Sequence, residues 1–188
     1  MVNIAGRPAV FLDRDGVIVQ TNIINRKPYA VRAVDALQIL PGVKTAIEEL
    51  KRIGFTIVVV TNQPDIGNGY VSKNTVKEMH SYLEANLSID VFKVCPHSQT
   101  EGCSCRKPEP GLLYEAADEF DLELGLSFMV GDRVSDMDAG LEAGCKCVFI
   151  DRCYAETELD LLNTSLIATG LPDAVRLIKN EITMIDRT

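Results

Sequence analysis

The sequence predicts an α/β fold built on a doubly wound, mostly parallel sheet. Three observations lead to this prediction: short apolar runs alternate with segments of helical apolar spacing, glycine, proline or serine separates them, and polar residues directly follow several of the runs. Strands that are buried on both faces of a parallel sheet read as continuous apolar runs. Alternation of such strands with helices implies right-handed crossovers within one sheet.

In the first half of the chain, we expect three strands and two helices. The strands are the apolar runs 9–13, 55–60 and 91–94. The first helix begins after Gly42 and ends at Gly54, because apolar residues recur at helical spacing between these glycines. Ser72 is a typical N-cap residue for the second helix. The apolar faces of the two helices are Val43, Ala46, Ile47, Leu50 and Ile53, and Val76, Met79, Leu83 and Leu87.

The second half of the chain supplies the remaining elements. We expect helices over about 110–120, 135–143 and 171–181, and strands over 127–130 and 146–150. The chain lacks an insertion of ~60 residues, the size of an extra folded module. Residues 1–188 are therefore expected to form a single domain without a large cap domain.

Composition and charge exclude several classes of protein. The 188 residues are 46% hydrophobic and 24% charged, as in a folded globular domain. The net charge of −8 argues against a nucleic-acid or acidic-membrane partner, and no stretch approaches the ~20 apolar residues of a membrane span. The N-terminus lacks the apolar core of a signal peptide, so we expect a cytoplasmic protein. We also expect it to be a monomer. Thiols stay reduced there, so the six cysteines suggest metal ligands or core residues rather than disulfides.

The segment Asp13-Arg14-Asp15-Gly16 directly follows the apolar core of the first predicted strand. Open α/β sheets bind ligands at the carboxyl ends of their strands. Both aspartates are therefore expected to project toward one crevice, with Gly16 allowing a tight turn beneath them. Carboxylates held close together repel each other unless a cation or proton joins them. The segment predicts a cation site, although by itself it is also typical of a solvated turn.

Three further polar segments follow predicted strands or lie in a loop after one. They are Thr61-Asn62-Gln63, Arg106-Lys107-Pro108, and Gly131-Asp132-Arg133 with Asp136. The first offers a hydroxyl and two amides to an anion, the second offers two cations, and the third adds carboxylates beside a helix start. Each alone is compatible with a helix cap, a solvated basic pair or an Asx turn. Together they predict one ligand site at the edge of the sheet.

These four segments, in this order, resemble the motifs of the haloacid dehalogenase-like phosphohydrolase superfamily. The resemblance implies a Rossmann-like fold in which Asp13 accepts the phosphoryl group and Asp15 is the general acid/base. It also implies that Thr61, Asn62 and Lys107 bind the transferred phosphoryl group. The chemistry agrees, because a carboxylate that attacks phosphorus forms an aspartyl-phosphate and divides one hard displacement into two easier ones.

The same resemblance implies a Mg²⁺ site. Its ligands would be Asp13, the main-chain carbonyl of Asp15, and Asp132, with Asp136 in support. Mg²⁺ prefers oxygen ligands, and it neutralises the repulsion between a carboxylate and a phosphate dianion.

A second group of metal-ligand residue types lies just before Lys107. Cys95, His97, Cys103 and Cys105 supply three thiols and one imidazole within eleven residues, a closed tetrahedral set for structural zinc. A zinc-bound loop here would hold the following basic pair in place. Cysteine redox chemistry near the cations is the alternative.

The remaining cysteines and the second histidine lack such neighbours. We expect Cys145, Cys147 and Cys153 to be buried small hydrophobic residues or exposed thiols rather than a second metal site. His80 lies on a predicted helix and is expected to be a partly buried surface residue.

Within the superfamily, the chain resembles two families of small zinc-loop phosphatases. One acts on the 7-phosphate of D-glycero-D-manno-heptose 1,7-bisphosphate and the other on histidinol phosphate. The segments 61–63, 106–111 and 131–133 are more similar to the heptose family, whereas the short gap between His97 and Cys103 is more similar to the histidinol family. The apparent insertion Thr21–Arg32 departs from the heptose family.

The heptose resemblance implies a small phosphorylated sugar as the substrate, with Gln63, Arg106 and Arg133 as its contacts. A phosphatase of histidinol phosphate or another small phosphomonoester is the first alternative. A phosphoaccepting receiver-like domain or a zinc-stabilised binding module is the second. Receivers use similar strand-end residues, but they need neither an acid/base such as Asp15 nor a zinc loop.

Overall fold

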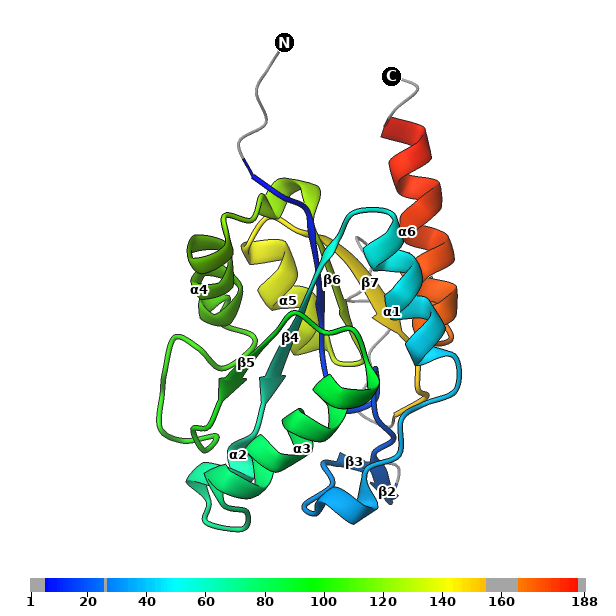
Figure 1. The fold of residues 1–188 in the computed structure, drawn as a ribbon. Helices are drawn as coiled ribbons and strands as arrows, with labels where there is room; N and C mark the ends of the chain where they lie inside the picture. The colour runs from blue at the N-terminus through cyan, green and yellow to red at the C-terminus, as the bar shows by residue number, and fades with distance from the viewer. Residues whose placement is uncertain (1–5, 26, 155–165, 186–188) are drawn as a thin grey trace.

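The computed structural model describes residues 6–25, 27–154 and 166–185. Within them, six strands form one sheet in the order β5-β4-β1-β6-β7-β8, and each neighbouring pair is parallel (Figure 1). The predicted α/β class is confirmed. The strands are β1 Ala9–Leu12, β4 Thr56–Asn62, β5 Val91–Cys95, β6 Phe128–Gly131, β7 Lys146–Ile150 and β8 Leu166–Ala168.

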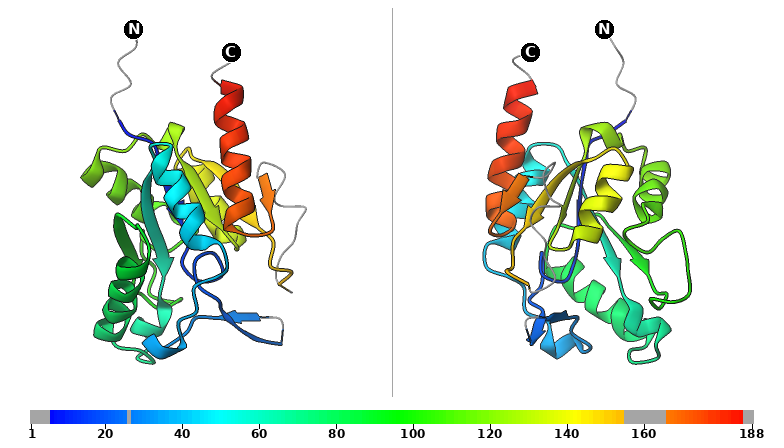
Figure 2. Two further views of the ribbon diagram at one scale, coloured as in Figure 1. Left: turned by 45° about the vertical axis from the view of Figure 1, so that its right-hand side comes forward. Right: turned by 180° about the vertical axis from the view of Figure 1, so that it is seen from behind.

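Helices cover both faces of the sheet, as a doubly wound fold requires (Figures 1 and 2). On one face, α1 (Val43–Arg52), α3 (Lys73–Asn86) and α6 (Leu171–Ile185) enclose one hydrophobic cluster. On the other face, α4 (Gly111–Phe120) and α5 (Val134–Glu142) enclose a second cluster.

The central strand β1 contributes to both clusters because side chains alternate between the faces of a strand. Val10 and Leu12 belong to the first cluster, and Ala9 and Phe11 to the second. All four are fully buried, which explains why this strand reads as a continuous apolar run.

The predicted helix starts and ends agree closely with the structure. The Ser72 hydroxyl accepts a hydrogen bond from the Thr75 amide at 2.9 Å, as expected of an N-cap. Helix α6 continues to Ile185, four residues beyond the predicted end. The expectation for His80 was wrong, because this α3 residue is buried and its ring stacks on Phe92 of β5.

Several short elements lack a sequence signal. Segment 21–32 contains an antiparallel hairpin of β2 (Asn22–Ile24) and β3 (Lys27–Tyr29), with residue 26 outside the described residues. Strand β2 is exposed along its length, so it shows neither alternation nor an apolar run. A single-turn helix, α2 (Pro64–Gly67), follows β4. Short 3-10 helices also occur at Val34–Ala36 and Leu124–Leu126.

The β2–β3 hairpin and α2 both lie at the end of the sheet toward which β4 points (Figure 1). No cap domain accompanies them among the described residues. No helix in the described part of the chain is long and apolar enough to cross a membrane.

Candidate active site

The carboxyl ends of the strands surround a cleft of about 680 Å³. Asp13 follows β1, Thr61 and Asn62 end β4, and Asp132 follows β6. The carboxylates of Asp13, Asp132 and Asp136 are buried and offer oxygen atoms within 4.8 Å of one another. The structure therefore brings together side chains that are more than a hundred residues apart in sequence.

Lys107 lies among these carboxylates with only 3% of its surface exposed. Its Nζ donates to Asp13 Oδ1 at 2.8 Å, to Asp136 Oδ1 at 2.6 Å and to the Val60 carbonyl at 2.8 Å. Burial alone would lower the pKa of Lys107, but the negative charges of Asp13 and Asp136 outweigh it and raise the pKa. All three ammonium protons have acceptors, so this cation is both charged and fixed in direction.

Asn62 holds the main chain of Lys107 at this place. Its Nδ2 donates to the Lys107 carbonyl at 3.0 Å, and its Oδ1 accepts from the Lys107 amide at 3.1 Å. Both ends of the Asn62 side chain are thus occupied within the protein.

The carboxylates of Asp132 and Asp136 have different surroundings. Asp136 Oδ2 accepts from the main-chain amides of Asp132 and Arg133, at 3.2 and 3.0 Å, and so caps α5. Asp132 Oδ2 accepts from the Tyr154 hydroxyl at 2.8 Å, but Asp132 Oδ1 is buried without a hydrogen-bond partner among the described residues. Burial, followed by the charges of Asp13 and Asp136, raises the pKa of Asp132.

A bound divalent cation accounts for this arrangement. Asp13, Asp132 and Asp136 carry three carboxylates against the single charge of Lys107, and one buried oxygen lacks a donor. Oxygen donors of this type suit Mg²⁺. Both oxygens of Asp136 already accept hydrogen bonds, so Asp13 and Asp132 are the better metal ligands. Asp136 supports the site by binding Lys107 and the main chain of Arg133.

Asp15 lies beside this cluster and is held by two side chains. Arg14 forms a two-nitrogen contact with its carboxylate, and Gln63 Nε2 donates to Asp15 Oδ2 at 2.8 Å. The same Gln63 amide donates to Thr61 Oγ1 at 2.9 Å. Gln63 is 2% exposed, so its amide serves mainly to join Asp15 to Thr61.

Two buried contributors to the site were missed at the level of sequence. No role was predicted for Arg14, although its position between Asp13 and Asp15 could have indicated one. Tyr154, which donates to Asp132 and lies 3.3 Å from Thr21 Oγ1, follows β7 without any motif. Burial, together with the charge of Asp132, raises the pKa of Tyr154, so its hydroxyl keeps the proton that it donates.

Basic and aromatic side chains form the rim of the cleft. Arg133 Nη2 donates to the Pro28 carbonyl at 3.3 Å, which ties the β2–β3 hairpin to the site. Arg106 also lines the cleft, and its Nη1 is buried without a hydrogen-bond partner in the described part of the chain. Segment 21–32 therefore builds one wall of this cleft.

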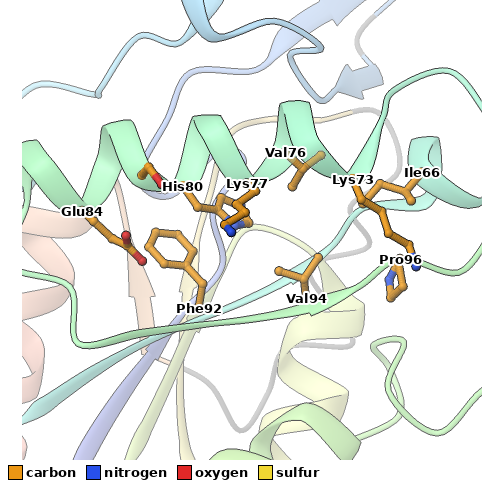
Figure 3. A pocket seen from close by; sticks show the side chains of 10 residues that line it. Ile66, Lys73, Val76, Lys77, His80, Glu84, Phe92, Val94 and Pro96 are labelled. Atoms are coloured by element: carbon orange, nitrogen blue, oxygen red, sulfur yellow. The ribbon is translucent and has the colours of Figure 1, made fainter.

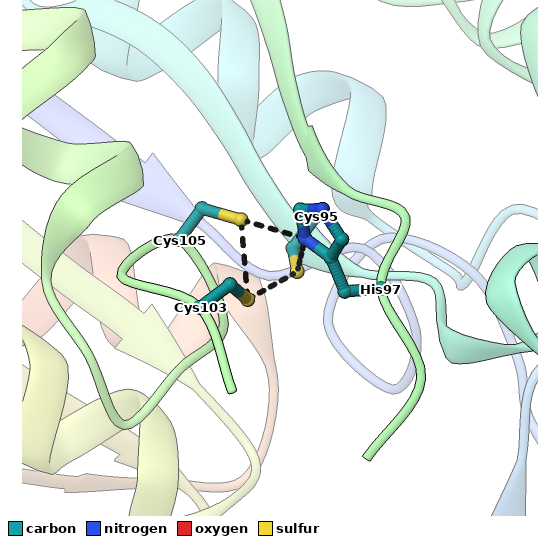
Figure 4. A group of neighbouring side chains, drawn as sticks. All are labelled: Cys95, His97, Cys103 and Cys105. Carbon is teal, nitrogen blue, oxygen red and sulfur yellow. Dashed lines mark hydrogen bonds between the residues drawn. The ribbon is translucent and has the colours of Figure 1, made fainter. Parts of the chain in front are cut away.

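The predicted metal loop forms a compact cluster of Cys95, His97, Cys103 and Cys105 (Figure 4). His97 Nδ1 lies 3.5 Å from Cys95 Sγ and 3.2 Å from Cys105 Sγ. Cys103 Sγ lies 3.7 Å from Cys95 Sγ and 3.5 Å from Cys105 Sγ. A tetrahedron with Zn–S bonds of about 2.3 Å has edges of about 3.7 Å. The ligand set and its spacing therefore fit zinc.

The surroundings of the cluster shift the pKa values of its thiols in different directions. Burial opposes a thiolate at Cys103, but hydrogen bonds from neighbouring thiols and main-chain amides lower its pKa to about 7. Burial and the adjacent thiols raise the pKa of Cys105 to about 12. Zinc binds cysteine as the thiolate, so metal binding would release protons from these thiols.

The other cysteines lie where the sequence predicts. Cys145 and Cys147 are buried in the second hydrophobic cluster, and Cys153 is exposed. Burial raises the pKa of both Cys145 and Cys147 to about 12, so they behave as inert core residues.

Removing zinc is expected to destabilise the protein. The cluster clips the loop between β5 and α4, so a strong chelator or Cys103→Ser should lower Tm by at least about 5 °C. Elemental analysis should find about one zinc per chain in the untreated protein, and Cys153→Ser, outside the cluster, should retain both metal and Tm. Fully active and equally stable protein without zinc would contradict the structural role.

Comparisons with known proteins agree with this geometry. A family model described as haloacid dehalogenase-like hydrolase matches residues 20–144. D-glycero-beta-D-manno-heptose-1,7-bisphosphate 7-phosphatase of Pasteurella multocida is 35% identical over 186 residues, covering 92% of this chain and 97% of the relative. The enzyme of the same name from Escherichia coli K12 is 35% identical and covers 90% and 94%.

A solved structure is also similar. The crystal structure of D,D-heptose 1,7-bisphosphate phosphatase from B. bronchiseptica, complexed with magnesium and phosphate, superposes with a TM-score of 0.82 at 28% identity. The match covers 93% of this chain and 99% of that one. The fold, the family model and the full-length relatives together place the chain in the haloacid dehalogenase-like hydrolase family.

Proposed function

We propose that this protein is a magnesium-dependent phosphatase that removes the 7-phosphate of D-glycero-D-manno-heptose 1,7-bisphosphate through an aspartyl-phosphate. The observation that carries the proposal is the buried cluster of Asp13, Asp132 and Lys107, in which one Asp132 oxygen lacks a donor within the described residues. Similarity to heptose bisphosphate phosphatases along about nine-tenths of the chain supports the choice of substrate. In this proposal, residues 1–188 act as one domain.

Asp13 is the nucleophile in the proposed mechanism. The Lys107 ammonium donates to Asp13 Oδ1 at 2.8 Å and so fixes the direction of this carboxylate. The same charge would stabilise the equatorial oxygens of the phosphoryl group during transfer. Attack by the carboxylate forms the new P–O bond as the bond to the sugar oxygen breaks.

Asp15 moves the proton. It protonates the departing sugar oxygen, and it then takes a proton from the water that hydrolyses the aspartyl-phosphate. Thr61 Oγ1 accepts a hydrogen bond from Gln63, which leaves its own proton available to a phosphate oxygen. Asn62 acts on the phosphoryl group through the Lys107 main chain that it holds.

Asp13, Asp132 and the main-chain carbonyl of Asp15 would hold Mg²⁺, with Asp136 supporting them. When bound, this ion offsets the repulsion between the carboxylates and the phosphate dianion.

The rim favours a substrate with a second anionic group. Arg106 has an unpartnered, buried guanidinium nitrogen within the described structure, and it lines the cleft together with Arg133. A guanidinium binds a phosphate through two parallel hydrogen bonds. The amine of histidinol phosphate would instead be repelled by these cations, although the short gap between His97 and Cys103 resembles the histidinol family.

A substrate panel tests this choice. With Mg²⁺, the heptose bisphosphate should give the highest kcat/KM among heptose phosphates, histidinol phosphate and common phosphomonoesters. Arg106→Ala should lower kcat/KM for the bisphosphate by ~10–100-fold, the effect of losing a charged hydrogen bond. Its effect on a heptose monophosphate should be only about 3-fold. If histidinol phosphate is turned over faster than any heptose bisphosphate, the proposed substrate is wrong. The short gap between His97 and Cys103 would then have indicated the correct family.

The monomeric state and the cytoplasmic location stay predictions. The state is checked by measuring the mass of the purified protein in solution.

A further inference from the structure

The guanidinium of Arg14 is fully buried directly behind Asp15. Its Nε donates to Asp15 Oδ2 at 3.1 Å, and its Nη2 donates to Asp15 Oδ2 and Oδ1 at 2.8 and 3.1 Å. The third nitrogen, Nη1, lies 3.3 Å from His80 Nε2 and 4.0 Å from Met79 Sδ. Burying a charge is unfavourable unless it is paired and hydrogen-bonded, and even a paired charge gains little stability. The burial of Arg14 is therefore better explained by function than by stability.

His80 is the fixed end of this chain of contacts. It lies on α3 with 7% of its surface exposed, and its ring stacks on Phe92 with centroids 4.3 Å apart and planes 14° apart. The two rings also line a pocket of about 400 Å³ between α3 and β5 (Figure 3). Helix α3 is anchored in the core through Met79 and Leu83, so His80 has a rigid support.

The proton positions follow from the partners. Arginine can only donate, so His80 Nε2 must accept from Arg14 and the ring proton must be on Nδ1. Burial, followed by the charge of Arg14, lowers the pKa of His80 to about 3. The ring is therefore neutral near physiological pH.

We propose that Arg14 and His80 are positioning residues, which hold the Asp15 carboxylate at the angle required for proton transfer. This inference rests on the proposed function, in which Asp15 is the acid/base. His80 fixes the guanidinium of Arg14, and the guanidinium fixes the plane of the carboxylate. Displacement of a reacting group by about 1 Å can cost ~10²-fold in rate, so such support has a measurable effect.

The contacts also distinguish the two oxygens of Asp15. Oδ2 accepts from Arg14 Nε, Arg14 Nη2 and Gln63 Nε2, whereas Oδ1 accepts only from Arg14 Nη2 among the described residues. Oδ1 is consequently the oxygen that carries the proton to the departing sugar oxygen, and Oδ2 is the anchored one.

Substitutions at His80 test this arrangement without placing an uncompensated charge in the core. His80→Leu removes the acceptor, whereas His80→Gln keeps an acceptor oxygen near the place of Nε2. Leu83→Met is the matched control, since it changes another fully buried side chain on α3 that contacts neither Arg14 nor His80 by a hydrogen bond in the described structure. All three variants are compared with the wild type in the first turnover with Mg²⁺.

The readout is the dependence on the leaving group. An alkoxide needs a proton from Asp15 as it departs, whereas p-nitrophenolate leaves without one. His80→Leu should slow the first turnover of an alkyl phosphate ~10-fold and that of p-nitrophenyl phosphate ~2-fold or less, with unchanged KM. His80→Gln and Leu83→Met should behave as the wild type. An equal loss on both substrates, or a loss confined to KM, would overturn the proposal.

A second measurement separates this inference from the proposed function. The chain has only two histidines, so the ¹⁵N signals of the His80 ring are assigned by comparison with His80→Gln. A neutral ring with the proton on Nδ1 is expected near neutral pH, and a proton on Nε2 would refute the Arg14 contact. If the wild-type protein hydrolyses no phosphomonoester, the proposed function is wrong, and so is the catalytic role proposed for Arg14 and His80. The spectra would in that case still show whether Arg14 donates to His80.

Discussion

Asp13→Asn is expected to abolish turnover, with a loss of at least ~10⁴-fold in kcat at saturating substrate and Mg²⁺. An amide has nearly the shape of a carboxylate but does not attack phosphorus. Its carbonyl oxygen can still accept from Lys107 Nζ, so the buried lysine keeps a partner and the fold should persist. The rate of phosphate release measures the loss of activity in the variant. Mass spectrometry of acid-quenched wild-type protein shows which residue carries the phosphoryl group.

A matched control separates loss of the nucleophile from the general effect of removing a carboxylate. Asp138 is exposed on α5, so Asp138→Asn makes the same chemical change outside the cleft. This variant should retain wild-type kcat. A phosphoenzyme trapped on any residue other than Asp13 would count decisively against the mechanism.

The main elements of the fold were predictable because their signals are local. β1 is buried on both faces and reads as an unbroken apolar run, and α1 shows helical spacing between two glycines. The meeting of Asp13, Thr61 and Asp132 was predictable for a similar reason, since Asp13 and Asp132 follow parallel strands, Thr61 lies near the end of another, and such strands end at one edge of the sheet. The zinc cluster is likewise compact in sequence.

The remaining features depend on contacts that no local pattern records. The β2–β3 hairpin is short and exposed, and Arg133 ties it to the site only through the Pro28 carbonyl. Tyr154 reaches Asp132 from the end of β7, and His80 reaches Arg14 across 66 residues of sequence. Gln63 lines the cleft, and the hydrogen bonds by which its amide joins Asp15 to Thr61 also have no local signal.

Gly16→Ala is expected to disable the magnesium site even though it removes no functional group. Gly16 has φ of 88°, and a Cβ there would lie 1.8 Å from Asp132 Oδ2 and 2.9 Å from the Tyr154 hydroxyl. The Asp132 carboxylate must therefore move, and displacement of this kind should lower kcat/KM by at least ~10²-fold. The wild-type protein should show a rise in Tm with Mg²⁺, and the variant should lose most of that rise.

Gly144→Ala is the control that isolates backbone strain from the steric clash. Gly144 has a similar φ of 83°, but a Cβ there would meet nothing within 4 Å. Both substitutions place alanine in the left-handed region, which costs about 1–2 kcal/mol, so both should lower Tm in the absence of metal. Only Gly16→Ala should also lose the Mg²⁺-dependent rise in Tm and the activity. If both variants lose activity and the Mg²⁺-dependent rise in Tm equally, the effect of Gly16→Ala comes from backbone strain alone. Displacement of Asp132 would then have no measurable effect.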